Sequence, residues 1–374
     1  MNLTQGPKQS AIYPMTTSPI SFIFSAPLLL SSSVATLRSG FRTLLSTFFI
    51  ILLFHFPVLA QDDLSPAVTS PIGIKRAPRV TDCRFGEVPA TDSIHKGRLW
   101  LVTGVHVVGY GGSLIILSKA WYANYPKTSF HTFNDSKEWL QMDKVGHGWT
   151  AYNAGRISAG MWKWAGVPAK KAAWIGAATA TAYLIGIEFL DAHSAEWGWS
   201  WSDIAANFFG SGFFLGQELL WGEQRIQYKF SFHKKDYSDP VLEQRADDLF
   251  GESWYERMLK DYNAQTYWFS ANLKSFFKQN KLPPWLNISV GYGADGMFGG
   301  FENKWTDEAG NVIDRTDIPR KRQFYLAPDI DFTKIKTNQK WLRTVFTLLN
   351  AFKCPAPTLM IDSHGKFKAY AIYF

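Results

Sequence analysis

Three pairs of ionisable or polar residues stand next to uncharged stretches rich in small residues, and their spacing suits one face of a helix. Members of a pair are three or four positions apart, and side chains at that spacing are neighbours on a helix. Charged groups beside apolar sequence are costly unless they meet one another, water or a metal ion. We therefore expect the three pairs to converge on one site. The pairs are Asp143 and His147, Glu188 and Asp191, and Asp203 and Asn207.

A cluster of carboxylates around one imidazole can hold a divalent metal ion or share acid–base work. Mixed oxygen and nitrogen ligands suit zinc or manganese. Four acids close together cannot all stay ionised without a counter-charge, so a bound cation or raised pKa values should accompany the cluster. The candidate metal ligands are Asp143, His147, Glu188, Asp191 and Asp203. The candidate catalytic residues are these five together with Ser202 and Asn207.

Each of these residues also has a purely structural interpretation. Asp143 can complement the dipole at a helix N-terminus, and Ser202 is a good N-cap with Asp203 in the first turn. A lone histidine such as His147 is more often a core residue with satisfied hydrogen bonds. Glu188 can simply mark a helix end that reaches water. The joint pattern favours a site more than any single member does.

The segment that carries these pairs predicts a helical bundle domain over residues 98–232. Three uncharged runs, 99–118, 172–187 and 204–217, are rich in glycine, alanine and serine, which lets helices approach closely. The first run has 20 residues, long enough to span a bilayer. We expect the bundle to be embedded in a membrane or to lie against one; a tightly packed soluble bundle is the alternative.

The C-terminal half changes character and predicts an α+β protein. Residues 233–285 are polar and indicate a partly helical connector, whereas 286–374 contain short alternating runs typical of strands. The turn sequence at 362–365 predicts a hairpin that joins the last two strands. We expect a small antiparallel β unit, with too few strands to close a membrane barrel.

The N-terminus predicts export to the cell envelope of a Gram-negative cell. Within residues 1–60, Arg38 and Arg42 precede a short apolar run that ends on Val58-Leu59-Ala60, as in a signal peptide cleaved after Ala60. Residues 61–97 indicate a linker rich in proline, serine and threonine. The expected location is the periplasm or a membrane surface, the outer membrane included. Cys83 and Cys354 could pair there, but two cysteines define no disulfide framework.

Composition and motifs exclude two classes of partner. The formal charge of +8 is spread along the chain rather than clustered, which argues against a nucleic-acid surface. Residues 291–296 match GxGxxG, but a glycine-rich turn follows instead of the helix that a nucleotide phosphate needs. Aromatic residues make up 16% of the chain, as suits a membrane interface. A membrane lipid or another envelope component is the expected partner; the oligomeric state is left open.

The runs 143–152 and 187–219 resemble the YfiM-like family of predicted periplasmic proteins (domain of unknown function 2279), over about residues 134–232. The resemblance implies an envelope location and supplies no reaction. More distantly, the pattern is similar to that of VanZ-like membrane proteins, although Asp191 stands where those have a glutamine. No cysteine follows the signal peptide in the position that a lipid anchor would need.

Three functions remain open from the sequence. The first is a non-enzymatic envelope protein whose polar cluster locks a helical bundle at a membrane. The second is a metal-assisted hydrolase or transferase acting on a lipid-linked or cell-wall substrate. The third is a binding module whose β-rich tail docks in or on the outer membrane. Convergence of the candidate residues around one accessible point would favour the second.

Overall fold

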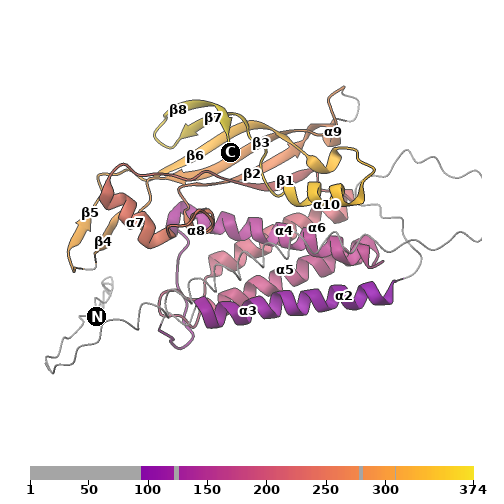
Figure 1. Ribbon diagram of the computed structural model, residues 1–374, viewed down its shortest axis with the longest axis horizontal. Coiled ribbons are helices and arrows are strands. Elements are labelled where there is room, and N and C mark those ends of the chain that lie inside the picture. The colour runs from indigo at the N-terminus through magenta and orange to yellow at the C-terminus, as the bar shows by residue number, and fades with distance from the viewer. Residues whose placement is uncertain (1–93, 122–125, 278–280, 308) are drawn as a thin grey trace, which may run out of the picture. The chain divides into compact units, whose positions relative to one another are not determined.

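The computed structural model describes residues 94–121, 126–277, 281–307 and 309–374, with the side chains of residues 120 and 121 left aside. Helices fill the first half of this part and an antiparallel sheet the second, which confirms the predicted α+β class (Figure 1). The signal peptide, nearly all of the linker and Cys83 lie outside the described residues. Cys354 is partly buried and free.

Four long helical segments run side by side (Figure 1). The first is continuous and alternates between α-helix and π-helix. The other three are regular α-helices, and a short 3-10 turn directly precedes the first of these three. The first segment comprises α2 (Lys96–His106), η2 (Val107–Gly111), α3 (Gly112–Ile116) and η3 (Leu117–Trp121). The turn is η5 (Glu138–Gln141), and the helices are α4 (Met142–Trp164), α5 (Ala169–Asp191) and α6 (Trp201–Trp221).

Glycine permits the close packing of α4 against its two neighbours. A side chain at Gly210 of α6 would overlap the backbone carbonyl of Gly148 in α4. A side chain at Gly176 of α5 would overlap the carbonyl of Gly155. Small residues were expected to bring these helices together, and here they allow backbone-to-backbone contact.

Among the residues that the structure describes, two helices are long and apolar enough to cross a membrane, judged by length and composition alone. They are Lys96–Lys119, with 24 residues, and Ala169–Asp191, with 23. The first is hardly covered by the rest of the described protein: Trp100 and Val108 are 75% and 74% exposed. Such an apolar surface is unusual for a helix that faces only water.

The main sheet has six antiparallel strands in the order β1-β2-β3-β6-β7-β8. They are β1 (Ile226–Phe232), β2 (Gln265–Asn272), β3 (Leu286–Asp295), β6 (Lys321–Ile330), β7 (Ala356–Asp362) and β8 (Phe367–Tyr373). The predicted hairpin at 362–365 joins β7 to β8 and is confirmed. Two short strands, β4 (Lys304–Thr306) and β5 (Val312–Asp314), pair separately.

Short helices connect the strands. They are α7 (Pro240–Phe250), α8 (Trp254–Lys260), α9 (Leu273–Phe276), η6 (Phe332–Lys334) and α10 (Lys340–Leu349). The segment 291–296 continues β3 into a turn at Gly296, so no helix follows the GxGxxG motif. This is the glycine-rich turn that the sequence predicts after the motif.

The sheet begins earlier in the chain than the predicted start at residue 286. β1 was placed in the bundle domain and β2 in the polar connector, and both assignments were wrong. β1 alternates apolar and polar residues from Ile226 to Phe232, a period-two signal that the prediction overlooked. β2 is buried on both faces, with Tyr267 and Trp268 adjacent, so it carries no clear alternation.

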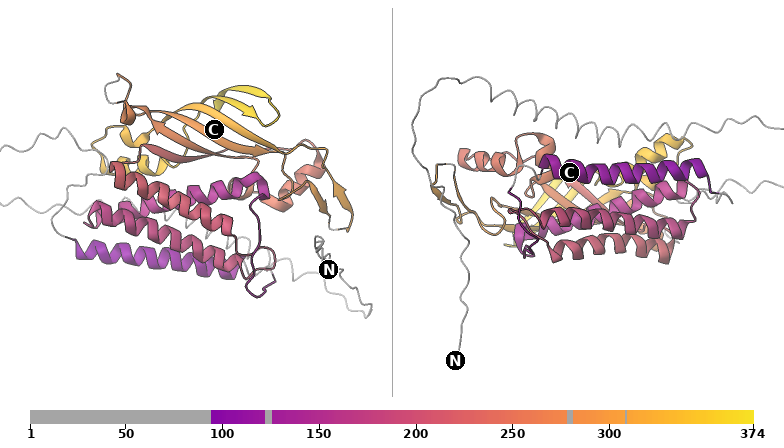
Figure 2. Two further views of the ribbon diagram at one scale, coloured as in Figure 1. Left: turned by 180° about the vertical axis from the view of Figure 1, so that it is seen from behind. Right: turned by 90° about the horizontal axis from the view of Figure 1, so that it is seen from below.

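One face of the sheet packs on the helices. Tyr228, Phe230 and Tyr267 from β1 and β2 share a core with Met142 and Tyr152 of α4. Figure 2 shows the strands lying over this side of the helical layer. The core therefore sits between the bundle and the first two strands, and it anchors the N-terminal half of α4.

The opposite face of the sheet carries mostly polar side chains. The sheet curls so that this face lines its inside. Trp268 of β2 contacts Tyr373 of β8, although three strands separate them in the sheet. At the other edge, the backbone around Phe352 hydrogen-bonds to Phe230 of β1, at 2.9 Å from Phe230 N to Ala351 O. The sheet thus forms a roll whose two edges approach each other.

Candidate functional site

Three helix ends meet at one end of the bundle and bring the predicted cluster together. Asp143 and His147 lie in the first two turns of α4, and Asp203 lies in the first turn of α6. Glu188 lies in the last turn of α5. Because α4 and α6 begin where α5 ends, residues far apart in the sequence become neighbours.

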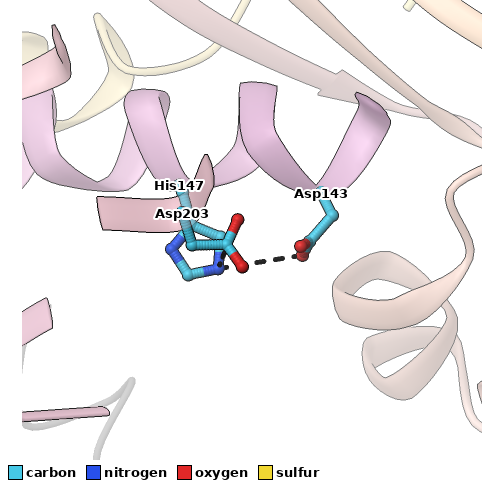
Figure 3. A group of neighbouring side chains, drawn as sticks. All are labelled: Asp143, His147 and Asp203. Carbon is cyan, nitrogen blue, oxygen red and sulfur yellow. Dashed lines mark ion pairs between the residues drawn. The ribbon is translucent and has the colours of Figure 1, made fainter. Parts of the chain in front are cut away.

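His147 is the centre of this cluster (Figure 3). Its Nε2 lies 3.8 Å from Oδ1 of Asp143 and 3.9 Å from Oδ1 of Asp203. Its Nδ1 lies 3.1 Å from Oδ1 of Asn207 and 3.6 Å from Oε1 of Glu188. Four of the predicted partners therefore surround one imidazole, and both ring nitrogens face oxygen atoms.

The contact with Asn207 fixes which ring nitrogen carries a proton. A carbonyl oxygen only accepts hydrogen bonds, so Nδ1 of His147 donates to Oδ1 of Asn207. In the neutral ring Nε2 is then an acceptor that faces two carboxylate oxygens, which is unfavourable. The contact is relieved by a proton on His147 or on Asp203, or by a cation held between the three groups.

The three facing groups lie close enough together to be candidate ligands of one metal ion. One donor atom each from Asp143, His147 and Asp203 lies within 4.8 Å of the other two. Zinc–ligand distances are about 2.0–2.2 Å, so two ligands of a tetrahedral ion lie roughly 3.4 Å apart. The separations of 3.8 and 3.9 Å from Nε2 to the carboxylates are slightly wider, and small side-chain rotations would close them.

Lys144 supplies the one fixed positive charge of the cluster. Its Nζ lies 2.7 Å from Oδ1 of Asp203, 2.8 Å from Oδ2 of Asp143 and 2.5 Å from Oδ2 of Asp135. One ammonium thus faces three carboxylates. Together with Glu188 the site contains four acids against one lysine, so neutrality requires either protonation of some of these groups or a further cation.

Asp135 is a member of the cluster that the sequence analysis missed. The hydroxyls of Ser200 and Ser202 both donate to its Oδ1, at 2.6 Å each. The prediction that Ser202 caps α6 was wrong: Ser200 is the N-cap and accepts from Asp203 N at 3.0 Å. Ser202, one residue inside the helix, is thereby free to bind Asp135.

Tyr262 is a second missed member, and it comes from the other half of the protein. It lies between α8 and β2, and its hydroxyl donates to Oδ1 of Asp143 at 2.8 Å. Its ring packs on Trp139, with centroids 5.4 Å apart. No local sequence pattern marks Tyr262, because only the tertiary fold brings it to α4.

The chain enters the site through a strained turn. Trp139, Leu140 and Gln141 all have positive φ angles, of 48°, 50° and 64°. Side chains disfavour this left-handed region, and such strain clusters at functional sites. The turn is held by partners from the sheet region: Tyr292 Oη donates to Leu140 O at 2.5 Å, and Trp139 N donates to Gly300 O at 2.7 Å.

Burial and the surrounding charges shift the pKa values in opposite directions. Burial raises the pKa of Glu188 to about 8, with help from the charge of Asp203 and against the pull of His147. Burial and the charge of Asp143 likewise raise the pKa of Asp203. Burial opposes the ionisation of Asp143, but the charges of His147 and Lys144 hold its pKa below the ordinary value.

The pKa of His147 shifts in the direction that favours the protonated, charged imidazole. Burial alone would lower the pKa of His147, but the charges of Asp143, Asp203 and Glu188 together raise it above the ordinary value. The shifts therefore favour the protonated forms of His147, Glu188 and Asp203 in the metal-free cluster. A divalent cation bound by His147 and Asp203 would have to displace their protons.

Solvent reaches the cluster from one side. The side chains of Asp143 and His147 are 24% and 19% exposed, whereas those of Asp203 and Glu188 are 6% and 2% exposed. The buried Oε1 of Glu188 accepts no hydrogen bond from the described residues. The open edge of the cluster is thus the one formed by Asp143 and His147.

Asp191 is the fifth predicted ligand. It is the last residue of α5, one turn beyond Glu188, and is partly buried. Its charge contributes to the raised pKa of Glu188. The geometry thus gives Asp191 an electrostatic influence on the cluster, and its role as a ligand remains a prediction.

Comparison with known proteins gives a family for this helical region. No curated protein and no solved structure matches the chain. A family model described as "Predicted periplasmic lipoprotein (DUF2279)" matches residues 132–216, which contain every residue of the cluster except Tyr262. The match confirms the resemblance to that family and the cell-envelope location, and it leaves the VanZ-like similarity a prediction. Residues 132–216 of this envelope protein are thus a region of the DUF2279 type.

Proposed function

We propose that this envelope protein binds a divalent cation, zinc or manganese, through Asp143, His147 and Asp203, and acts as a hydrolase or transferase. The observation that carries the proposal is the meeting of Nε2 of His147 with two carboxylate oxygens at one point. A bound ion of this kind polarises a carbonyl or phosphoryl oxygen and makes bound water nucleophilic near neutral pH.

The residues around the three ligands have roles that fit this proposal. Asn207 fixes the imidazole in the tautomer that presents Nε2. Glu188, buried and with a pKa of about 8, can hold a proton at neutral pH and release it. The ammonium of Lys144 balances part of the negative charge of the carboxylates, and a divalent ion would balance negative charge that remains.

The substrate class follows from where the site lies. The protein belongs to the envelope, and exposed apolar helices flank the cluster's end of the bundle, with Phe189 and Trp201 54% and 68% exposed. Aromatic side chains of this kind suit a membrane–water interface. A lipid-linked or cell-wall substrate is therefore the class that we propose.

A second candidate function is supported by Lys144. Its three ion pairs join the segment before α4 to α4 and α6, as expected of a non-enzymatic cluster that locks the bundle. In that case the positive charge at Nε2 of His147 would be a proton. The two candidates differ in whether the purified protein binds a metal ion at this point.

Metal titration of the full chain by isothermal calorimetry, with Zn²⁺ and with Mn²⁺, tests the proposal. We expect one ion per chain, and at least a tenfold weaker affinity for His147→Ala because one ligand is lost. His193→Ala is the matched control: His193 lies just beyond α5, and its ring contacts Phe189 rather than the cluster. An unchanged affinity in His147→Ala, or no binding by the unmodified protein, would overturn the metal site.

A further inference from the structure

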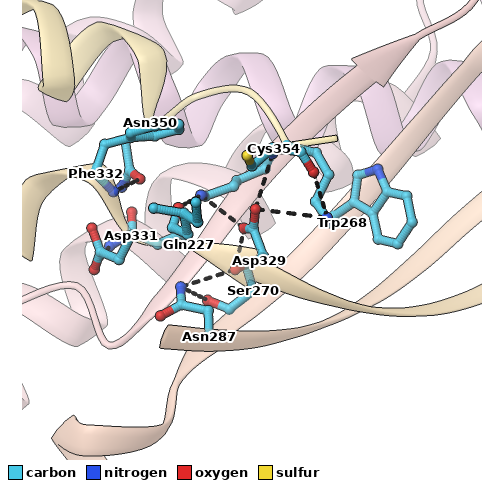
Figure 4. A network of polar contacts seen from close by, with 12 residues as sticks. Gln227, Trp268, Ser270, Asn287, Asp329, Asp331, Phe332, Asn350 and Cys354 are labelled. Atoms are coloured by element: carbon cyan, nitrogen blue, oxygen red, sulfur yellow. Dashed lines mark hydrogen bonds and ion pairs between the residues drawn. The ribbon is translucent and has the colours of Figure 1, made fainter. Parts of the chain in front are cut away.

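The inside of the rolled sheet is a polar space with a closed floor. Lys229 and Lys353 are both fully buried, and both face the equally buried Asp329. Nζ of Lys229 lies 2.8 Å from Oδ2 of Asp329, and Nζ of Lys353 lies 3.7 Å from its Oδ1. Figure 4 shows Asp329 within this network of polar contacts, between Ser270 and Cys354. Lys353 also donates to the carbonyl of Pro328 at 2.8 Å. These charges are paired and hydrogen-bonded, so the floor is a structural network.

A layer of aromatic rings covers this floor. Trp268 is fully buried, and the ammonium of Lys353 lies 5.2 Å from its ring centroid. Tyr325 and Tyr373 also pack against Trp268, with ring centroids 5.6 and 6.1 Å from it. The interior of the roll therefore combines buried charges, aromatic rings and tyrosine hydroxyls.

Beyond the tyrosines the roll opens into a cavity of about 360 Å³, which we name the roll mouth. Cavities of this size commonly hold small molecules, and the mouths of closed sheets are a frequent place for them. His233 and Lys235, which follow β1, line it at one edge of the sheet, and Lys368 and Tyr370 of β8 line it at the other. Asp295 and Tyr325 line it from the adjacent central strands β3 and β6. Because β1 and β8 are the two edge strands, residues from both edges meet at the mouth only because the sheet is rolled.

The polar groups of the roll mouth form a chain of donors and acceptors. The hydroxyl of Tyr373 donates to that of Tyr325 at 2.9 Å, and Tyr325 in turn donates to Gln323 Oε1 at 2.9 Å. Nδ1 of His233 is buried and has no hydrogen-bond partner among the described residues. A pocket lined by tyrosine hydroxyls and an amide suits a ligand with several hydroxyl groups.

The charges of the roll mouth add a preference for an anion. Lys235 is paired with Asp295, at 2.5 Å between Nζ and Oδ1. Lys368 makes no ion pair with any residue that the structure describes, and it lines the same cavity. One uncompensated ammonium thus faces the ligand space, while Asp295 would repel a second negative group.

We propose that the roll mouth binds a sugar that carries one anionic group. Hydroxyls of the sugar would exchange hydrogen bonds with Tyr373 and Gln323. The carbon face of the sugar ring would pack on Tyr370, which is less buried than the other two tyrosines of the roll mouth, Tyr325 and Tyr373. Its carboxylate or phosphate would pair with Lys368. This site shares no residue with the cluster around His147, so each of the two proposals can fail without the other.

Calorimetric titration of the full chain with three probes tests this proposal: D-glucuronic acid, glucose 6-phosphate and glucose. We expect saturable binding of at least one anionic sugar, roughly tenfold or more tighter than glucose, since a charge-assisted contact is worth about one decade or more in affinity. Binding of glucuronic acid alone identifies a carboxylate ligand, and binding of the phosphate ester alone identifies a phosphate ligand.

Two variants and a control connect that binding to the roll mouth. Lys368→Gln should weaken the anionic sugar about tenfold, and Tyr370→Ala should weaken glucose and the anionic sugar alike. Lys340→Gln removes the same charge from an exposed position at the start of α10 and should leave the affinity unchanged. Absence of binding to all three probes, equal affinity for glucose and the charged sugars, or an unaffected Lys368→Gln would each overturn the proposal.

Discussion

Lys144 and Asp203 form an ion pair of 2.7 Å that joins the first turns of two helices, α4 and α6. The ammonium occupies the place between carboxylates that a metal ion often takes in such clusters. A variant without this ammonium distinguishes between the two functions proposed for the site. In one, the lysine is the main counter-charge; in the other, it is an auxiliary to a bound cation.

Lys144→Met should destabilise the metal-free protein by about 3–5 kcal/mol, because it leaves buried carboxylates without their partner. If the site binds a divalent cation, millimolar Zn²⁺ or Mn²⁺ should restore much of this loss, since the ion binds only the folded state. Urea unfolding of the variant with and without the ion measures both effects. A loss that no divalent ion reduces would favour the structural role.

The stability of the metal-free protein should fall as pH rises from about 5 to 8. Glu188 and Asp203 have raised pKa values in the folded state, so in this window the folded protein binds more protons than the unfolded chain. The raised pKa of His147 acts in the same direction, because its charged form is favoured by folding. Chemical denaturation in EDTA at several pH values measures the slope, and Glu188→Gln should make it shallower. A stability that rises through this window would contradict the assigned shifts.

Metal affinity should show the opposite trend and increase over the same pH range, because the ligands must first lose their protons. Asn207→Ala should lower this affinity by about 10- to 100-fold at every pH, since His147 loses the acceptor that fixes its tautomer. Calorimetric titration at pH 6, 7 and 8 compares the two proteins. Equal affinities would show that Asn207 does not orient the imidazole.

Gly210→Ala should destabilise the protein by about 2 kcal/mol, because the new methyl group would overlap the backbone carbonyl of Gly148 and push α6 away from α4. The matched control is Gly212→Ala, two residues along the same helix, where a methyl group meets open space. Alanine favours the helix over glycine by about 1 kcal/mol, so the control should be neutral or slightly stabilising. Thermal unfolding of both variants makes the comparison, and a similar loss in both would mean that the helices are not in close contact.

The mature protein should begin at Gln61, because the apolar core of the signal ends on small residues at Val58 and Ala60. N-terminal sequencing of the protein isolated from the envelope measures this directly. A mature chain that still begins near Met1 would show that the apolar run is retained rather than cleaved.

The sequence was sufficient for the parts of the site that depend on helical periodicity. Asp143 and His147 lie on one face of α4 because they are four residues apart, and the cost of isolated charges correctly predicted that Glu188 and Asp203 would join them. Asp135 and Tyr262 could not be found this way. They reach the cluster from a loop and from the connection before β2, and nothing in the local spacing encodes such contacts.

Some strands of the sheet could likewise be predicted from the sequence, and others could not. The hairpin of β7 and β8 was predictable because a turn sequence separates two alternating runs. β2 was not, because a strand buried on both faces has no alternation to detect. The inward curl depends on contacts between strands that are not neighbours, such as Trp268 with Tyr373, and these lie beyond any local pattern.

The closure of the roll has a consequence for the order in which the chain can fold. Phe230 and Phe352 are in contact although most of the C-terminal half of the chain separates them in the sequence. The contact therefore closes a very long loop. Loop-closure entropy must be overcome before such a contact contributes, which slows folding. The helices can assemble from local contacts as they leave the export channel, whereas the roll must wait for its last strands. Until then the aromatic lining and the edges of β1 and β2 are exposed, and the half-translocated chain is at its most prone to aggregation.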